Sequence, residues 1–309
     1  PYPLKDAFDT LAEVQPSINV AYYAGHGDLR SLVMGEDFKR KATAAEVDSM
    51  AKLLQQELDA GALGLSTGLE YDPGIYSDRA EVLALAKVAA AARSRYISHI
   101  RSEDRWFWDA IDEVIAIGRE AKLPVQISHV KLAMVPLWGR ADSLITLLEA
   151  ARAAGVDVTA DIYPYPYWHS TLTVLFPERD FSDRAEAQKV LREIAKPEGL
   201  LIGRFAADTS YQGRTVAELA VRRKEDPAST LMGLIRESIA YEAAHPGSGG
   251  ESVVATSMDE PDIVRLMQWE HTNFCSDGAL DGAHPRGFGS FTRVLGRYVR
   301  EQRVMPLEQ

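Results

Sequence analysis

Two stretches of the sequence share one pattern, Tyr96-Ile97-Ser98-His99-Ile100 and Val125-Gln126-Ile127-Ser128-His129-Val130. Each is a short apolar run, which favours a buried strand, and each is followed by a segment of helical length. Side chains alternate between the two faces of a strand, so His99 and His129 share one face of neighbouring parallel strands. A single histidine there is more often a hydrogen-bonded core residue, but the repetition at two strand ends favours a site for a divalent metal ion.

The alternation of strand and helix runs through most of the chain. Strand-like segments lie near residues 18, 62, 96, 124, 156 and 272, with helical segments at about 4–14, 43–60, 78–93, 104–121 and 140–153. This alternation predicts an α/β fold with a parallel sheet, and six such units are two short of a (β/α)8 or TIM-like barrel. A doubly wound sheet is the alternative. The barrel is favoured because no Gly-x-Gly-x-x-Gly motif follows the first strand and the chemical residues are spread over several strand ends.

Local signals set the limits of several elements. Thr43 and Glu46 form a candidate capping box at the start of one helix, and Ser77 is the expected cap of the next. The segment 18–24 is expected to be a strand that ends in a glycine turn. The prolines and aromatic residues of the segment 163–168 predict a loop at the mouth of the barrel.

The regular alternation breaks between residues 175 and 255. This stretch is polar, with short helical segments near 183–195, 214–224 and 228–243 and a glycine-rich end. We expect residues 1–309 to form one incomplete barrel, with 175–255 inserted before the last strand as a helical, lid-like subdomain. The alternative is an appendage that only packs against the barrel.

The charge of the chain argues against nucleic-acid and membrane partners. Its 309 residues include 34 Lys and Arg against 45 Asp and Glu, a formal net charge of −11. Such a surface repels nucleic acid and anionic lipid, so we expect a small-molecule substrate. The sequence has no apolar run of transmembrane length, and its single cysteine, Cys275, allows no intrachain disulfide. Both features fit the cytoplasm.

The chain begins at Pro1 without a methionine and stops at Leu307-Glu308-Gln309, where a further helical pattern begins. We therefore expect an internal piece of a longer protein, whose own amino terminus and any export signal lie upstream.

A third residue completes a hydrolytic site. Metal-assisted hydrolysis needs a Lewis acid and a carboxylate that deprotonates water. Asp277 follows the last predicted strand and, if the sheet curls into a barrel, lies near His99 and His129. We expect it to contact the metal and to act as general base and then general acid. Taken alone, Ser276-Asp277-Gly278 is a common turn.

With these residues in place, the sequence resembles the N-acyl-D-amino-acid deacylases, or D-aminoacylases, of the amidohydrolase superfamily. The matching motifs are Gly25-His26-Gly27-Asp28-Leu29-Arg30, Gly64-Leu65-Ser66-Thr67-Gly68-Leu69, Ser98-His99-Ile100-Arg101, Ser128-His129-Val130-Lys131, Asp161-Ile162-Tyr163-Pro164-Tyr165, Ser276-Asp277-Gly278 and His284-Pro285-Arg286-Gly287-Phe288-Gly289-Ser290-Phe291. The resemblance implies zinc-dependent hydrolysis of the amide bond of N-acyl-D-amino acids to a carboxylate and a free D-amino acid.

The resemblance also assigns roles to residues. It implies that His99 and His129 bind one or two zinc ions and that Asp277 is the catalytic acid. It further implies that Lys131, Tyr163 and Arg286 hold the substrate carboxylate, with Tyr71 near them. The Arg fork, the Lys ammonium and the Tyr hydroxyl all suit a carboxylate.

Three features of the family are missing from this sequence. The family has a His-x-His pair on the first barrel strand and a metal-binding cysteine on the second, whereas this chain begins at what corresponds to the third. Cys275 does not match that cysteine, and we expect it to be a buried small residue. The family's small β-sandwich is absent as well. We therefore expect the fragment alone to be inactive.

Two other functions stay open. A cyclic-amide hydrolase of the dihydroorotase or hydantoinase type would keep the fold and the metal, but such enzymes usually bridge two metals with a carbamylated lysine, and the segment 62–67 contains no lysine. A catalytically silent barrel that only binds a ligand is the second alternative.

Overall fold

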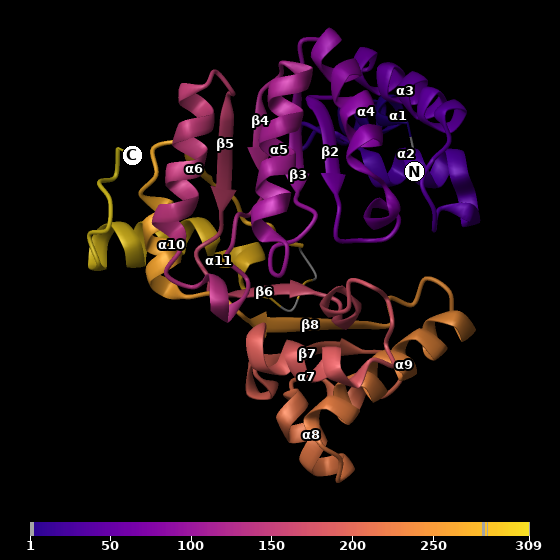
Figure 1. Ribbon diagram of the computed structural model, residues 1–309, viewed down its shortest axis with the longest axis vertical. Helices are drawn as coiled ribbons and strands as arrows, with labels where there is room; N and C mark the ends of the chain where they lie inside the picture. Colours follow the sequence, from indigo (N-terminus) through magenta and orange to yellow (C-terminus); the bar gives the residue numbers. More distant parts are fainter. Residues whose placement is uncertain (1–2, 280–281, 283, 309) are drawn as a thin grey trace. The chain divides into compact units, whose positions relative to one another are not determined.

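The computed structural model describes residues 3–279, 282 and 284–308. The chain divides into two compact units, shown in sequence colours in Figure 1. Unit 1 comprises Pro1–Val130 and Leu144–Asp161, and unit 2 comprises Lys131–Ser143 and Ile162–Gln309. Among the described residues, no helix combines the length and the apolar character that crossing a bilayer requires.

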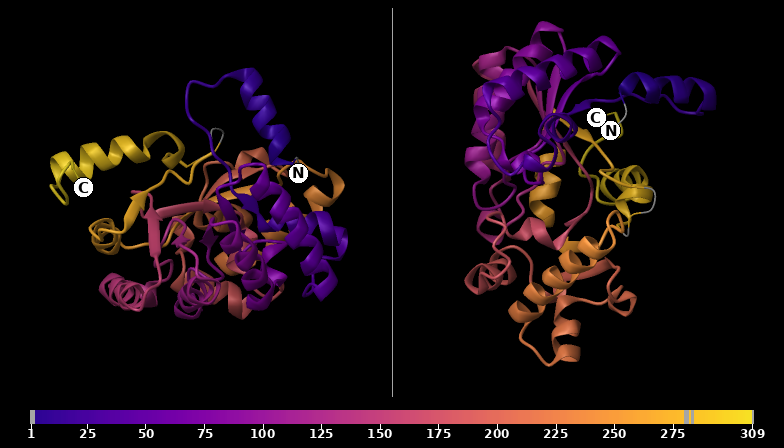
Figure 2. Two further views of the ribbon diagram at one scale, coloured as in Figure 1. Left: turned by 90° about the horizontal axis from the view of Figure 1, so that it is seen from above. Right: turned by 90° about the vertical axis from the view of Figure 1, so that its right-hand side faces the viewer.

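Unit 1 is built on a parallel sheet. Its strands are β1 (Ala24–Gly25), β2 (Gly64–Gly68), β3 (Arg95–His99), β4 (Val125–Ile127) and β5 (Val158–Ile162), each paired with the next. Its helices are α1 (Leu4–Val14), α2 (His26–Met34), α3 (Ala44–Asp59), α4 (Arg79–Ala91), α5 (Phe107–Ala121) and α6 (Ala141–Ala153). In Figure 2, α1 projects away from the helices that cover the sheet.

Helix caps explain where the covering helices begin. Thr43 accepts the backbone N–H of Glu46 and the Glu46 side chain returns to Thr43, so the predicted capping box is confirmed. The predicted cap of α4 at Ser77 is wrong. Asp78 is the N-cap and accepts the N–H of Glu81, whereas the Ser77 hydroxyl donates to the Gly74 carbonyl.

The first predicted strand is mostly wrong. Only Ala24 and Gly25 pair with β2, and the preceding segment is irregular, with Ile18 71% exposed. The Tyr22 carbonyl accepts the Leu63 N–H at 2.8 Å, but the paired register with β2 begins only at Ala24. The expected glycine turn is instead the start of α2 at His26. A Cβ atom at Gly25, the N-cap, would lie 2.8 Å from Oδ2 of Asp28, so a larger residue there would displace that side chain.

Unit 2 contains an antiparallel sheet in the order β6-β8-β7. Its strands are β6 (Tyr167–Ser170), β7 (Leu200–Phe205) and β8 (Glu251–Thr256), and the helices of the same region are α7 (Arg184–Glu193), α8 (Val216–Arg223) and α9 (Pro227–Ala244). Helices α7 and α8 both pack on α9. The three helices agree with the predicted ones.

Two strands of this sheet were missed. The segment 163–168 was predicted to be a loop throughout, but β6 begins at Tyr167, because Trp168 is buried and donates its indole N–H to the Ser257 hydroxyl at 2.6 Å. Strand β7 lies inside a stretch that was predicted to be helical and polar. Its alternating burial places Leu200 and Ile202 in the core, a pattern too short to stand out beside three helices.

The remaining elements of unit 2 include β9, which is the sixth strand of the parallel sheet. The elements are α10 (Glu260–Met267), β9 (Thr272–Phe274), α11 (Arg286–Arg293) and a π-helix (Val294–Glu301). The Cys275 N–H donates to the Ile162 carbonyl at 3.1 Å, which brings β9 to the end of β5 and gives the strand order β1-β2-β3-β4-β5-β9. The predicted α/β fold with a parallel sheet of six strands is confirmed.

One acidic side chain of unit 2 is buried in the antiparallel sheet. Glu251 is 8% exposed, and its Oε1 accepts the Leu172 N–H at 2.7 Å. Burial raises the pKa of Glu251 to about 8, although the Leu172 N–H acts in the opposite direction. The carboxyl group is therefore protonated in the folded protein at neutral pH.

We expect Glu251 to make the protein less stable as the pH rises. Its pKa is about 8 when folded and 4.5 as a model value, so the unfolded state loses the proton first. The contribution of Glu251 to the free energy of unfolding is then fully present below about pH 4.5. It falls by on the order of 4 kcal/mol up to about pH 8. Glu251→Gln mimics the neutral acid and should flatten this slope in urea unfolding measured from pH 5 to 8.

The control is Glu242→Gln, because the Ser248 hydroxyl lowers the pKa of Glu242 and its titration lies on the acid side. This variant should keep the slope of wild type between pH 5 and 8. An unchanged slope in Glu251→Gln would contradict the assignment.

Candidate metal centre

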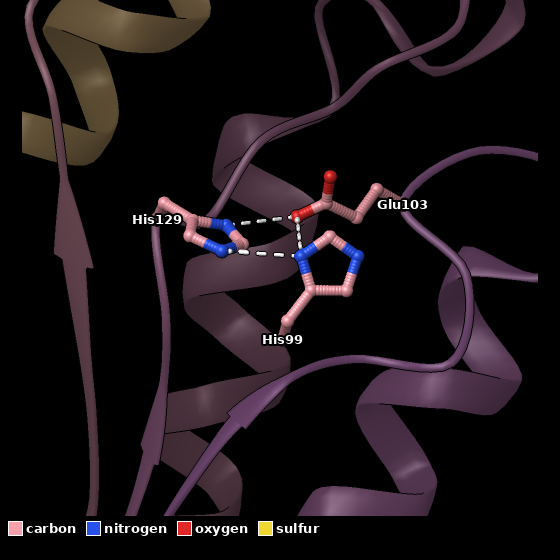
Figure 3. Close-up of side chains that lie close together, drawn as sticks. All are labelled: His99, Glu103 and His129. Atoms are coloured by element: carbon pink, nitrogen blue, oxygen red, sulfur yellow. Dashed lines mark hydrogen bonds and ion pairs between the residues drawn. The ribbon is translucent and has the colours of Figure 1, made fainter. Parts of the chain in front are cut away.

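The two histidines predicted from the sequence lie side by side in unit 1. His99 is the last residue of β3 and His129 follows β4 by two residues, and these strands pair in parallel with Ser98 opposite Ile127. Nδ1 of His99 lies 3.1 Å from Nε2 of His129, as Figure 3 shows. Both side chains are largely buried, with 9% and 12% of their surface exposed.

Two glutamates that were not predicted complete this group. Oε1 of Glu103 lies 3.0 Å from Nδ1 of His129 and 3.8 Å from Nδ1 of His99 (Figure 3). Oε2 of Glu70 lies 3.0 Å from Nε2 of His99, the other nitrogen of that ring. Both acids follow strand ends, Glu70 after β2 and Glu103 four residues after His99, and this position in the sequence is the signal that would have found them.

The electrostatics of Glu70 reflect two opposed effects. Desolvation by burial raises the pKa of Glu70 above its ordinary value, and the hydrogen bond from His99 acts to lower it. The carboxyl group thus depends on a cationic or hydrogen-bond-donating neighbour for its charged form.

The backbone at His129 is held in an unfavourable conformation. Its φ is 38°, in the left-handed region that histidine visits only rarely. The Asp161 carboxylate accepts the His129 N–H at 2.6 Å, and the Asp161 carbonyl accepts the Val130 N–H at 2.7 Å. This pair of hydrogen bonds from β5 holds the His129 ring on the side of His99.

The donor set fits a zinc ion. Zinc takes imidazole nitrogens at about 2.0–2.1 Å and carboxylate oxygens at similar distances, in tetrahedral geometry. Two nitrogens bound in that way lie a little over 3 Å apart, and Nδ1 of His99 and Nε2 of His129 lie 3.1 Å apart. The nearest atoms of His99, His129 and Glu103 all lie within 4.8 Å of one another.

Tyr71 lies in the same unit, with its ring centroid 4.6 Å from that of His99. The sequence associated Tyr71 with the residues that hold the substrate carboxylate. In the structure one neighbour of Tyr71 is His99, a histidine of the candidate metal centre.

The other predicted site residues come together in unit 2, in a group that we call the cationic cluster: Lys131, Tyr163, Asp277 and Arg286. Arg286 is 6% exposed, and its Nη1 lies 2.6 Å from Oδ2 of Asp277. The guanidinium stands 4.7 Å above the centroid of the Tyr163 ring, and Nζ of Lys131 lies 5.6 Å from the same centroid. Two buried cations thus lie near one aromatic ring, with one carboxylate beside Arg286.

His284 lies beside the cationic cluster and hydrogen-bonds to the backbone of Arg286. It is 2% exposed, and its Nε2 lies 2.7 Å from the Tyr167 carbonyl, which can only accept. Its Nδ1 accepts the Arg286 backbone N–H at 2.9 Å. Burial lowers the pKa of His284 to about 4, so the ring is neutral at neutral pH with its proton on Nε2. His284 opens one of the matching motifs, but no role followed for it from the sequence.

Two further expectations concern single residues. Cys275 is half-buried, so the expectation that it is fully buried is wrong. His26, from the matching motif that begins at Gly25, is fully buried with its Nε2 2.7 Å from Oε1 of Glu81, which Arg30 also contacts.

Comparison with known proteins shows that the chain is homologous to the N-acyl-D-amino-acid deacylases, a group of amidohydrolases. The relative N-acyl-D-glutamate deacylase from Alcaligenes xylosoxydans xylosoxydans is 38% identical over 303 residues, which is 97% of this chain and 56% of the relative. The resemblance inferred from the sequence is confirmed. No family model matches the chain.

Solved structures give the same result. The N-acyl-D-glutamate deacylase from Bordetella bronchiseptica matches with a TM-score of 0.83 and 35% identity, over 98% of this chain and 58% of that one. That crystal structure contains zinc and a phosphonate inhibitor that mimics the tetrahedral intermediate of its reaction. A D-aminoacylase structure matches with a TM-score of 0.82 and 30% identity, again over 98% of this chain and 58% of that one. The present chain thus spans little more than half the length of the relatives it matches.

The contact between Asp161 and His129 gives a test of how the centre is held. Asp161→Ala removes the acceptor of the His129 N–H and of the Gln126 side-chain N–H, and the loss of these partly buried hydrogen bonds should lower the free energy of unfolding by about 2–3 kcal/mol. Asp161→Asn keeps an acceptor oxygen and should cost about half as much. Urea unfolding measures both values. A loss below about 0.5 kcal/mol in the alanine variant would show that His129 keeps its conformation without Asp161.

Proposed function

We propose that the protein to which this chain belongs is a zinc-dependent hydrolase that cleaves the amide bond of N-acyl-D-amino acids, releasing a carboxylate and a free D-amino acid. One observation carries the proposal. Two imidazoles from neighbouring strand ends present nitrogens 3.1 Å apart, with a carboxylate beside them. Two imidazole nitrogens and a carboxylate placed in this way are a donor set that suits a divalent metal ion.

In this proposal His99 and His129 bind the metal, with Glu103 as the nearest carboxylate. Bound zinc supplies Lewis acidity, which polarises the scissile carbonyl and makes water a better nucleophile at neutral pH. Further ligands are expected from the part of the protein that precedes this chain, and one or two ions fit the residues present.

Asp277 is the proposed proton carrier and an additional metal ligand. Its carboxylate would accept a proton from the attacking water and deliver it to the leaving nitrogen, so that no amide anion has to depart. Nη1 of the neighbouring Arg286 lies 2.6 Å from Oδ2 of Asp277 and holds the carboxylate in place.

The cationic cluster is the proposed site for the substrate carboxylate. Arg286 offers a planar fork of N–H donors, and Lys131 adds a second charge near the Tyr163 ring. The hydroxyl of Tyr163 supplies a further donor. Fixing the carboxylate orients the acyl amide toward the reacting groups, and Tyr71 is proposed to contact the substrate from beside His99.

The relatives support this substrate class. Their names describe proteins that deacylate N-acyl-D-glutamate and N-acyl-D-aspartate, along with a D-aminoacylase. The segment 175–255 is proposed to close over the substrate as a lid within an incomplete barrel of residues 1–309. A small-molecule partner and a cytoplasmic location complete the proposal.

The function is tested by hydrolysis in the full-length protein. N-acetyl-D-glutamate, N-acetyl-D-aspartate and N-acetyl-D-leucine should yield free amino acid, their L-isomers should not, and removal of metal by a chelator should abolish turnover until zinc is restored. Asp277→Asn should lower kcat by about 100- to 10,000-fold, because the amide cannot accept the proton. His99→Ala should lose zinc as well as activity.

Two results would redirect the proposal. Turnover of hydantoins in preference to N-acetyl-D-amino acids would identify a cyclic-amide hydrolase. Zinc binding without turnover of either substrate would identify a silent binding barrel. Unchanged kcat in Asp277→Asn would remove this residue from the mechanism.

A further inference from the structure

One side chain contacts two members of the candidate metal centre at once. Oε2 of Glu70 lies 3.0 Å from Nε2 of His99, and Oε1 of Glu70 accepts the backbone N–H of Glu103 at 2.9 Å. Glu70 follows β2, whereas His99 and Glu103 belong to β3 and its loop. The Glu70 carboxylate therefore fixes both of them to the neighbouring strand.

The donor and acceptor roles in the two hydrogen bonds of Glu70 indicate which nitrogen of His99 carries the ring proton. A backbone N–H can only donate, so Oε1 of Glu70 is an acceptor. We take Oε2 of Glu70 to accept as well, which places the proton of the His99 ring on Nε2. A neutral imidazole carries only one such proton. Nδ1 of His99 therefore presents its lone pair, and this atom is the one that faces His129.

A neighbouring carboxylate also determines which nitrogen of His129 carries the ring proton. Its Nδ1 lies 3.0 Å from Oε1 of Glu103, which places the ring proton there and the lone pair on Nε2. The lone pairs of Nδ1 of His99 and Nε2 of His129 then face each other across 3.1 Å. Two lone pairs in that position repel each other, and a cation bound by both removes the repulsion.

We propose that Glu70 is a positioning residue of the metal centre, which holds the ring proton on Nε2 of His99 and so presents Nδ1 to the metal. This inference rests on the proposed function, because it takes His99 and His129 as zinc ligands. Carboxylates that hold a metal-binding histidine in this way typically contribute 10- to 100-fold in metal affinity.

Two substitutions separate this role from a purely steric one. Glu70→Ala removes the acceptors. Glu70→Gln keeps the shape but has one acceptor oxygen for two N–H donors, so either the His99 proton or the Glu103 N–H loses its acceptor. Both variants should bind zinc about 10- to 100-fold more weakly, measured by competition with a chromophoric chelator. A steric role predicts that the glutamine variant binds zinc as wild type does.

The second readout needs no metal. In the metal-free, full-length protein, the ¹⁵N chemical shifts of labelled histidines report which ring nitrogen carries the proton, and His99→Gln identifies the His99 signals. We expect the proton on Nε2 in wild type, with a mixture of both ring forms in Glu70→Ala. A proton on Nδ1 of His99 in wild type, as a protonated Glu70 would produce, overturns the inference.

Glu46→Gln is the matched control, because the partners of Glu46 are Arg40 and Thr43 and neither belongs to the metal centre. Its zinc affinity and His99 shifts should equal those of wild type. Wild-type zinc affinity in both Glu70 variants overturns the inference and leaves the proposed function intact. Failure of wild type to bind zinc overturns the proposed function itself.

Discussion

The parallel pairing of β3 with β4 is the constraint on which the candidate site depends. Parallel strands end at the same edge of their sheet, so residues near the ends of adjacent strands become neighbours although about thirty positions separate them in the chain. His99 and His129 are neighbours for this reason. The loops that leave β2 and β3 at the same edge then bring two carboxylates to the two rings.

The repeated His pattern was predictable because a strand has a fixed period and a fixed direction. The covering helices were predictable for a similar reason, since a capping box such as that of Thr43 and Glu46 is a local signal. The antiparallel sheet was not predictable from the sequence. Many loops have a six-residue pattern like that of β7, and β7 forms a strand because it pairs with β8, about fifty residues later in the chain. Pairing over such distances leaves little trace in a local window.

The same distinction applies to the site residues. Arg286 and Lys131 were predicted from the family resemblance and share the Tyr163 ring in the structure. Glu70, Glu103 and His284 were missed, since each acts on another residue through a hydrogen bond that only the folded chain creates. A pattern of residue types identifies groups that perform chemistry more readily than groups that orient them.

At position 129 the left-handed backbone conformation lowers the stability of the fold, whereas the histidine side chain serves the proposed metal centre. Glycine would adopt a φ of 38° without the steric cost that a Cβ atom brings. The residue that gives the least backbone strain at position 129 is therefore one that has no imidazole. A lineage released from selection for catalysis would gain folding free energy by losing this histidine. A natural homologue with glycine at this position would therefore be a protein that has lost the catalytic activity and retained the fold.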